Sequence, residues 1–367
     1  MARQRKIGKE LHLFENRHAV QAGFSMVQNH EIAVVIPTFD RAEMLGAAIE
    51  SVLNQGSHIS FELIVVDNNS NDDTRAIVES YIRKSGNIRY LFESKRGAGN
   101  ARNRGIGNSS AEIIAFLDDD VRARPDWLAG IKHAFGRHPE ILFVGGKVLP
   151  EWKQAPPAWL TAEPWSPLAL VDYGDEAFVV DRQRQVCLVS ANLAVRRNAF
   201  DRFGCFSSEL MRCEDHEFEL RLIQAGEKGL YVPELEVTAD VQIERLSKKH
   251  HRSWHIDNGR TLAQIRAYHL PTAGIDSAEK QKDAATLFDV PSYVYRQCLG
   301  SLIPWARATA KRDESKAFLY ELQARNYFSY ILEIRRRSVK RRWSSVLLEA
   351  INFVTTLARR KLKKYTS

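Results

Sequence analysis

Short apolar runs alternate with amphipathic stretches over the first third of the chain. Most of the runs are rich in Val or Ile, which is typical of strands buried on both faces. The four runs lie at residues 33–37, 61–67, 88–92 and 112–118. Between them, apolar residues at helical spacing predict helices over residues 42–54 and 72–84. Strands that alternate with helices indicate βαβ units and a mostly parallel sheet.

The middle of the chain is less regular. Runs at residues 142–149 and 187–195 predict two further strands, and residues 150–184 between them hold five prolines and three tryptophans. Proline disrupts regular structure and tryptophan favours burial, so this segment is either a shaped loop over a site or a packed surface excursion. A helix is expected from about residue 215 to 225, because Gly226 is a typical helix stop.

These patterns divide the chain into three parts. Residues 1–30 form an N-terminal lead-in that has no apolar signal-peptide core, and residues 31–246 form the α/β domain. The pattern over residues 247–367 is helical. No run of eighteen apolar residues is present, so the sequence predicts no transmembrane helix.

The positive charge is concentrated at the C-terminal end. The net charge is +8, but residues 335–367 hold eleven basic residues and one acid, so residues 1–334 carry −2. A body close to neutral argues against nucleic acid as a partner. The four cysteines form no C-x-x-C pair, which argues against a zinc site or a disulfide framework and favours a reducing cytosol.

The basic tail at residues 335–367 has the pattern of an amphipathic helix. From Trp343 to Ala358 apolar residues recur at helical spacing, with basic clusters on both sides. Such a helix suits the anionic inner face of a membrane, where each basic residue is worth about 1 kcal/mol. The alternative is a helix that packs on the rest of the protein or on a partner.

Acidic residues follow the predicted strands. Asp67 ends the second run, and Asp118, Asp119 and Asp120 follow the fourth. Ligands of open α/β sheets bind beyond the carboxyl ends of the strands, so these residues are candidates for a site. A divalent cation relieves the repulsion within the triplet, and hard oxygen ligands favour Mg²⁺ or Mn²⁺. An acidic turn that caps the helix near Pro125 is the alternative.

Two further motifs have two interpretations each. Glu214 and Asp215 open a predicted helix, where acids interact favourably with the helix dipole, although a general base needs the same residue type. The run from Gly97 to Arg102 fails the dinucleotide fingerprint, because Arg102 occupies the third glycine position. It fits the start of a helix whose N-terminus, with Arg96 or Arg102, can face phosphate.

Taken together, the motifs resemble the family 2 glycosyltransferases. The resemblance runs from Ile32 to about Gly226 and rests on their order: VVIPTFDR, ELIVVDNNSNDDT, GAGNARNRGI, IIAFLDDDV and CEDHEF. It implies a GT-A fold, Rossmann-like with a mostly parallel central sheet flanked by helices and, here, a C-terminal helical extension. The nucleotide-sugar half would span residues 31–122 and the acceptor half residues 123–246.

The resemblance also implies residue roles. Thr38, Asp40 and Asp67 would line the pocket for the base and ribose. Asp118 would lie near the ribose and the metal, and Asp120 would be the main ligand of Mg²⁺ or Mn²⁺. Asp215 would be the general base, and the nucleotide side would also include Arg102 and Glu214.

Some positions within this resemblance bear on donor preference and on the metal. Asp40 stands where Asn is frequent, and Asn68 stands where a second acid often follows Asp67, which affects the preference for a donor. His250, beside His251, is a candidate for the further metal ligand that members of the fold often draw from downstream. A solvated basic patch is the alternative for this pair.

We therefore expect a metal-dependent, inverting hexosyltransferase. Its partners would be a nucleotide-sugar, with UDP as the expected nucleotide, and a glycan or lipid-linked acceptor of the cell envelope. The expected location is the cytoplasm, with the tail at the inner face of the plasma membrane. The alternatives are a nucleotidyltransferase of similar fold and a non-catalytic scaffold that binds nucleotide-sugars.

Overall fold

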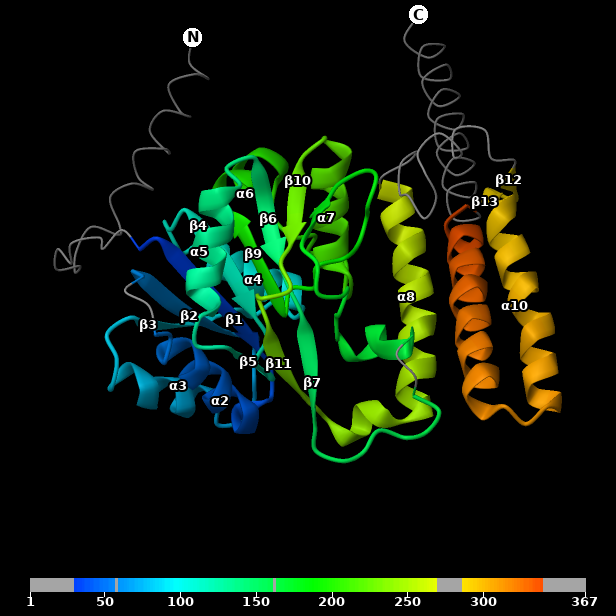
Figure 1. Cartoon of the computed structure of the whole chain (residues 1–367), viewed down its shortest axis with the longest axis horizontal. Coiled ribbons are helices and arrows are strands. Elements are labelled where there is room, and N and C mark those ends of the chain that lie inside the picture. The colour runs from blue at the N-terminus through cyan, green and yellow to red at the C-terminus, as the bar shows by residue number, and fades with distance from the viewer. Residues whose placement is uncertain (1–29, 57–58, 161–162, 269–285, 339–367) are drawn as a thin grey trace, which may run out of the picture.

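The computed structural model describes residues 30–56, 59–160, 163–268 and 286–338. It contains a large sheet flanked by helices, and a group of long helices at one end of the sheet (Figure 1). The predicted tail helix and all of the lead-in except its last residue lie outside the described residues. No helix in the described ranges is long and apolar enough to cross a membrane.

Eight strands form the central sheet. Their order is β3-β2-β1-β4-β9-β6-β10-β8, with bounds Ile88–Phe92, Phe61–Asp67, Ile32–Thr38, Ile113–Leu117, Asn192–Arg196, Ile141–Gly145, Lys228–Tyr231 and Phe178–Val180. The first four are parallel to one another, as the alternation of strands and helices predicts. The other half is mixed, because β9 runs antiparallel to both β4 and β6, and β8 runs antiparallel to β10.

A small second sheet extends from the central one. Its order is β5-β11-β7, with bounds Val121–Ala123, Val237–Val241 and Val148–Trp152. Because β5 directly follows the acidic triplet and pairs with β11, the segment that leads to the C-terminal helices returns to the edge of the sheet where the triplet lies. The short 3-10 helix η2, Ile243–Leu246, comes next.

Helices bury apolar faces against this sheet. They are α2, α3, α4, α5, α6 and α7, at Ala42–Leu53, Thr74–Ile82, Ala98–Ile106, Trp127–Arg137, Arg197–Phe203 and Glu214–Gln224. Helix α4 approaches β1 closely at Gly105, where an added Cβ atom would lie 2.5 Å from Val35 Cγ1. The absence of a side chain at Gly105 therefore allows α4 to pack closely on β1.

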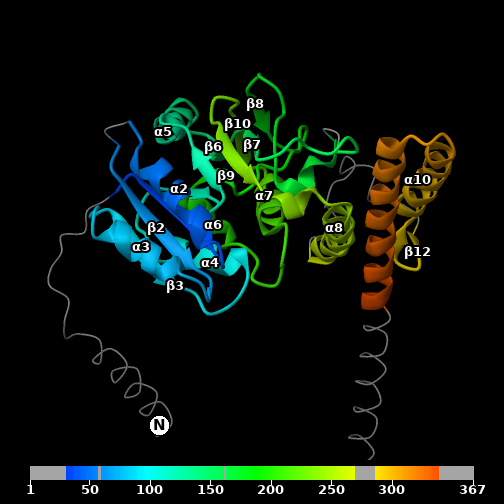
Figure 2. The same ribbon diagram turned by 90° about the horizontal axis from the view of Figure 1, so that it is seen from below.

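The C-terminal region forms a helical group beside α7. It contains α8, Lys248–Tyr268, the β-hairpin of β12, Thr286–Leu287, and β13, Val290–Pro291, then α10, Ser292–Ala310, and a helix over residues 314–338. The last helix lies between α8 and α10 in both views (Figures 1 and 2). Ala263, Val294, Tyr330 and Ile331 form the small apolar core that joins them.

Two predicted strands differ from the structure. The run at 142–149 is split between β6 and β7, which belong to different sheets. The split falls at Gly146, where the chain passes so close to Leu235 that an added Cβ atom would collide with its carbonyl oxygen. The run at 187–195 becomes a strand only at Asn192, because the backbone N–H of Leu188 donates to the Glu219 side chain.

The 150–184 segment contains little regular structure, as its prolines predict. It holds the end of β7, the 3-10 helix η1 at Glu163–Leu168, and β8. Within it, Pro167 and Ser166 line a cavity, which favours the interpretation of a shaped loop over a site.

Candidate active site

The carboxyl ends of the parallel strands bring the predicted acids together. In the register of β1 and β2, Thr38 lies opposite Asp67, and both side chains are buried. Strand β4 pairs with the other side of β1 and ends immediately before the aspartate triplet. One edge of the sheet therefore carries four aspartates from two strands, as the sequence predicts.

Arg102 joins the acidic triplet to the second acidic pair. It projects from α4, is 4% exposed, and donates from Nη1 to Glu214 and from Nη2 to Asp118, the latter at 2.7 Å. Glu214 is 5% exposed, whereas the Asp118 side chain is 27% exposed. The buried guanidinium thus holds the ends of β4 and α7 in one arrangement.

Asp119 and Asp120 are both paired with arginines. Arg41 Nη1 donates to Asp119 Oδ1 at 2.9 Å and to Asp120 Oδ2 at 2.8 Å, and Arg245 Nη1 lies 3.4 Å from Asp120 Oδ2. Burial raises the pKa of Asp119 to about 6, although the charge of Arg41 opposes the shift. Burial also raises the pKa of Asp120, again against the effect of Arg41.

Asp215 is held at the N-terminus of α7 by three hydrogen bonds. Its Oδ2 accepts from the backbone N–H and the hydroxyl of Ser190, both at 3.0 Å, and its Oδ1 accepts from the N–H of His216 at 2.8 Å. Cys213, which precedes the helix, has a left-handed backbone conformation that directs the chain into it. The carboxylate therefore has a fixed orientation beside the cavity that it lines.

The remaining nucleotide-side candidates stabilise loops at the same edge. Asp67 accepts from the Tyr90 hydroxyl at 2.8 Å and from the backbone of Ser70 at 2.8 Å, and Asp40 accepts from the backbone of Asn71 at 2.7 Å. Neither Asp40 nor Asp67 is among the described residues that line the two cavities at this edge.

Asn68 uses all of its hydrogen-bonding groups. Its amide donates to the carbonyls of Glu93 and Lys95, and its side-chain oxygen accepts from the N–H of Gly97 at 2.8 Å. An acid at this position would lack the two donors. The departure from the commonest family pattern therefore has a structural reason, namely the loop between β3 and α4.

Two cavities meet at these residues. One, of about 660 Å³, is lined by Thr38, Arg41, Asn68 and Asp119 among others. The other, of about 450 Å³, is lined by Asp215, Glu214, Ser190 and the 166–173 part of the proline-rich segment. They share six lining residues, Ala98, Arg102, Asp118, Met211, Arg212 and Arg245.

His250 contacts the proline-rich segment. Its Nε2 is 3.1 Å from the carbonyl oxygen of Pro167, and it lines neither of the two cavities. Its assignment as a metal ligand stays a prediction, as do those of Asp118 and Asp120. The donor chemistry of the two carboxylates suits a hard divalent cation. Asp118 lines both cavities, and Asp120, which lines neither, contacts Arg245, which lines both.

The architecture and the site together define a class of protein. The mixed central sheet flanked by helices, with a small second sheet beside it, has the GT-A fold, and the acids lie at the carboxyl ends of its strands. The mannosyltransferase PcManGT from Pyrobaculum calidifontis, solved with GDP-Man and Mn²⁺, has the same fold, with 16% identity over 81% of this chain and 86% of that one at a TM-score of 0.54. TarS of S. aureus, solved with UDP-GlcNAc, reaches a TM-score of 0.50 at 18% identity over 79% and 90% of the two chains.

The chain contains a family 2 glycosyltransferase domain. Residues 33–204 match the family model described as "Glycosyl transferase family 2". A similar protein is the glucosyl-dolichyl phosphate glucuronosyltransferase of Haloferax volcanii, at 23% identity over 55% of this chain and 66% of that protein. The chain thus spans less than two thirds of the length of this relative, and only 29% of a Campylobacter jejuni glucosyltransferase at 37% identity.

Sequence reasoning missed four residues of the site. Arg41, Arg212, Arg245 and Ser190 line the cavities or hold the predicted acids. Arg41 ends the VVIPTFDR motif, so its place directly after the first strand was the available signal. Arg245 and Ser190 belong to no motif, and only the pairing of distant strands brings them to the site.

Proposed function

We propose that the protein is an inverting hexosyltransferase that moves a sugar from a nucleotide diphosphate, with UDP as the expected nucleotide, to a hydroxyl of a glycan or lipid-linked acceptor. The observation that carries this proposal is the junction of the two cavities. One borders the carboxyl ends of β1 and β2, and the other contains the fixed carboxylate of Asp215. A donor in the first would present its sugar to an acceptor in the second.

In this proposal the reaction is one direct displacement. The acceptor oxygen forms a bond to the anomeric carbon while the bond from that carbon to the diphosphate oxygen breaks. The proton of the acceptor hydroxyl passes to Asp215, whose carboxylate is oriented by Ser190 and the N–H of His216. No side chain needs to form a covalent intermediate.

Positive groups at the junction suit the charge that develops on the leaving diphosphate. Arg212 and Arg245 line both cavities, and a preorganised cation at the developing charge stabilises the transition state. Asp120 and Asp118 are the proposed ligands of Mg²⁺ or Mn²⁺, which would supply further charge neutralisation at the diphosphate. Arg41 and Arg245 now pair with Asp120. If Asp120 bound the cation, the two guanidinium groups would leave this carboxylate and pair with the diphosphate.

The names of the similar proteins support this choice of substrates. The structures with the same fold were solved with GDP-Man and with UDP-GlcNAc. The Haloferax relative is named for a lipid-linked acceptor, a glucosyl-dolichyl phosphate. A lipid-linked acceptor agrees with a proposed place at the inner face of the plasma membrane.

The test is a thermal-stability screen of nucleotide-sugars with and without Mn²⁺. A ligand at 100 times its dissociation constant stabilises the folded state by about 2.7 kcal/mol, which corresponds to a rise of several degrees in melting temperature. We expect one nucleotide-sugar to give this rise with Mn²⁺ and a smaller rise without it. Asp120→Asn should lose the dependence on Mn²⁺. The control Asp126→Asn should keep it, because Asp126 is an exposed acid that follows β5 in the chain.

The donor identified in the screen is then incubated with lipid-linked sugars. Transfer of the sugar supports the proposal. Binding without transfer to any acceptor would favour the scaffold, and formation of pyrophosphate from a nucleoside triphosphate and a sugar phosphate would favour a nucleotidyltransferase. If no nucleotide-sugar raises the melting temperature, the proposed donor class is wrong.

A further inference from the structure

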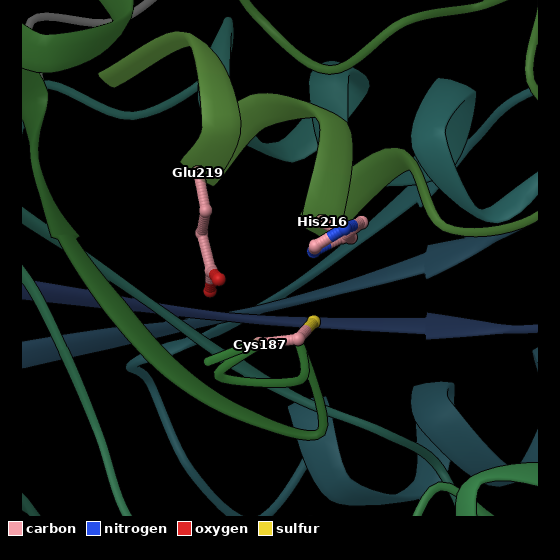
Figure 3. Close-up of side chains that lie close together, drawn as sticks. All are labelled: Cys187, His216 and Glu219. Atoms are coloured by element: carbon pink, nitrogen blue, oxygen red, sulfur yellow. The ribbon is translucent and has the colours of Figure 1, made fainter. Parts of the chain in front are cut away.

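Three metal-ligating side chains converge beside Asp215, and the proposed reaction assigns no role to any of the three side chains. The sulfur of Cys187, a ring nitrogen of His216 and a carboxylate oxygen of Glu219 all lie within 4.8 Å of one another. Figure 3 shows the three side chains directed toward one another across the gap between α7 and the segment before β9. In the described part of the chain, no other group of three such side chains meets this distance.

The fold brings these residues together through two neighbouring segments. His216 and Glu219 are three residues apart on α7 and therefore share one face of the helix. Cys187 lies in the irregular segment that the Glu219 carboxylate holds, since both of its oxygens accept from the N–H of Leu188 at 3.1 Å. The hydroxyl of Tyr173 donates to the carbonyl of Cys187 at 2.9 Å and holds the segment from its other side.

The Glu219 carboxylate has too few partners for a buried charge. It is 1% exposed, and among the described residues no arginine or lysine forms an ion pair with it. Asp215, another acid, adds repulsion. The backbone N–H of Leu188 is its hydrogen-bond donor. Burial of an ionised carboxylate is expensive unless it is paired or coordinates a metal.

The other two side chains are also available as ligands. Within the described ranges, the structure shows no hydrogen bond from the His216 ring or from the Cys187 sulfur. Both line the 450 Å³ cavity, so an ion and a water molecule can reach them. A thiolate and a carboxylate carry two negative charges, which a divalent cation would balance.

We infer that Cys187, His216 and Glu219 form a zinc site with one open position for water. Sulfur, nitrogen and oxygen donors suit Zn²⁺, which takes four ligands in a tetrahedron at about 2.0–2.3 Å. Ligand atoms in such a tetrahedron lie about 3.5 Å apart, so the side chains would draw in by roughly 1 Å. The site is distinct from that proposed at Asp118 and Asp120, where carboxylates favour a harder cation.

The cysteine spacing argues against a zinc site built on paired cysteines, and the inferred site differs from that expectation because it uses a single cysteine. The ion would connect α7 to the segment that carries Ser190, three residues after Cys187. Since Ser190 and the N–H of His216 both hold Asp215, the zinc ion would stabilise the position of that carboxylate. The zinc site itself does not depend on the proposed transfer reaction, and its test does not measure activity.

The test is the metal content of the full chain. The protein is purified from zinc-supplemented medium, dialysed without chelator, and its zinc is measured by mass spectrometry. We expect one zinc ion per chain in the wild type and in Cys205→Ser, which removes an exposed cysteine. The double variant Cys187→Ser/His216→Asn should contain no zinc above background. Circular dichroism and the melting curve show whether each variant is folded.

Cobalt substitution gives a second measurement that needs only folded wild type and Cys187→Ser. Co²⁺ bound to the wild type should give a thiolate-to-metal absorption band in the near ultraviolet, and Cys187→Ser should lack it. The inference is overturned if wild-type protein supplied with zinc retains none. It is also overturned if the double variant keeps its zinc, or if the cobalt spectrum is the same in both proteins.

Discussion

Replacement of Arg102 by methionine tests the buried ionic connection between β4 and α7. Methionine keeps much of the length and apolar volume of the side chain but removes the charge that faces Glu214 and Asp118. The Arg102 and Glu214 side chains are 4% and 7% exposed, so Glu214 would remain as an uncompensated buried acid. Removing one partner of such a pair costs about 3–5 kcal/mol.

The contribution of Asp118 to this cost is smaller. Its side chain is 27% exposed, so solvent screens the charge, and pairs of this kind contribute about 0–1 kcal/mol. We therefore expect Arg102→Met to lower the free energy of unfolding by about 3–5 kcal/mol, chiefly through Glu214. Arg102→Met/Glu214→Gln is the matched variant, and it should recover most of the loss because it leaves no buried charge at Glu214.

The loss of stability in Arg102→Met should also depend on pH. Burial raises the pKa of Glu214, and the charge of Arg102 opposes that shift, so the pKa rises further in Arg102→Met. A raised pKa in the folded state means that the variant is least stable at high pH, where Glu214 must be ionised, and that the loss decreases as Glu214 takes up a proton. Guanidinium denaturation at pH 5 and pH 8 measures both effects. A loss below about 1 kcal/mol, or an equal loss in the double variant, would refute the reasoning.

Three further substitutions probe the carboxyl edge of the sheet and the packing of α4 on its face. Asn68→Asp removes two donors to the carbonyls of Glu93 and Lys95 and should lower stability by about 1–3 kcal/mol in denaturant melts, and an unchanged stability would contradict this role of the amide. Gly105→Ala should cost about 1–3 kcal/mol because its Cβ would meet Val35, whereas Gly136→Ala, which has open space, should be neutral or stabilising. Because the pKa of Asp119 is raised to about 6, the stability of the wild type relative to Asp119→Asn should fall as pH rises from 4 to 7, and a flat difference would contradict that shift.

The parallel half of the sheet could be predicted from sequence because its signals are local. Each of β1 to β4 is a short apolar run, and the acids of the triplet and Asp67 directly follow two of them. In a parallel arrangement, such residues reach the same edge whatever the rest of the chain does. The helix that begins at Glu214 was equally visible, since apolar spacing and a terminal glycine mark its course.

The electrostatic arrangement of the site could not be predicted in the same way. Arg41 lies 78 residues before Asp119, and Arg245 lies 125 residues after Asp120, so their pairing depends on the second sheet and on η2. The segment at 187–191 was expected to be a strand, but the buried carboxylate of Glu219 binds its backbone instead. Such contacts join residues far apart in the chain and leave no periodic pattern.

In the proposed reaction, the Asp215 carboxylate accepts the proton of the acceptor hydroxyl. The most direct test compares wild type, Asp215→Asn and the control Asp126→Asn in two assays, donor binding and sugar transfer. We predict that Asp215→Asn binds the nucleotide-sugar nearly as well as the wild type and that its transfer rate falls by about 10²–10⁴-fold. Transfer by folded Asp215→Asn at a rate close to that of Asp126→Asn would contradict this role.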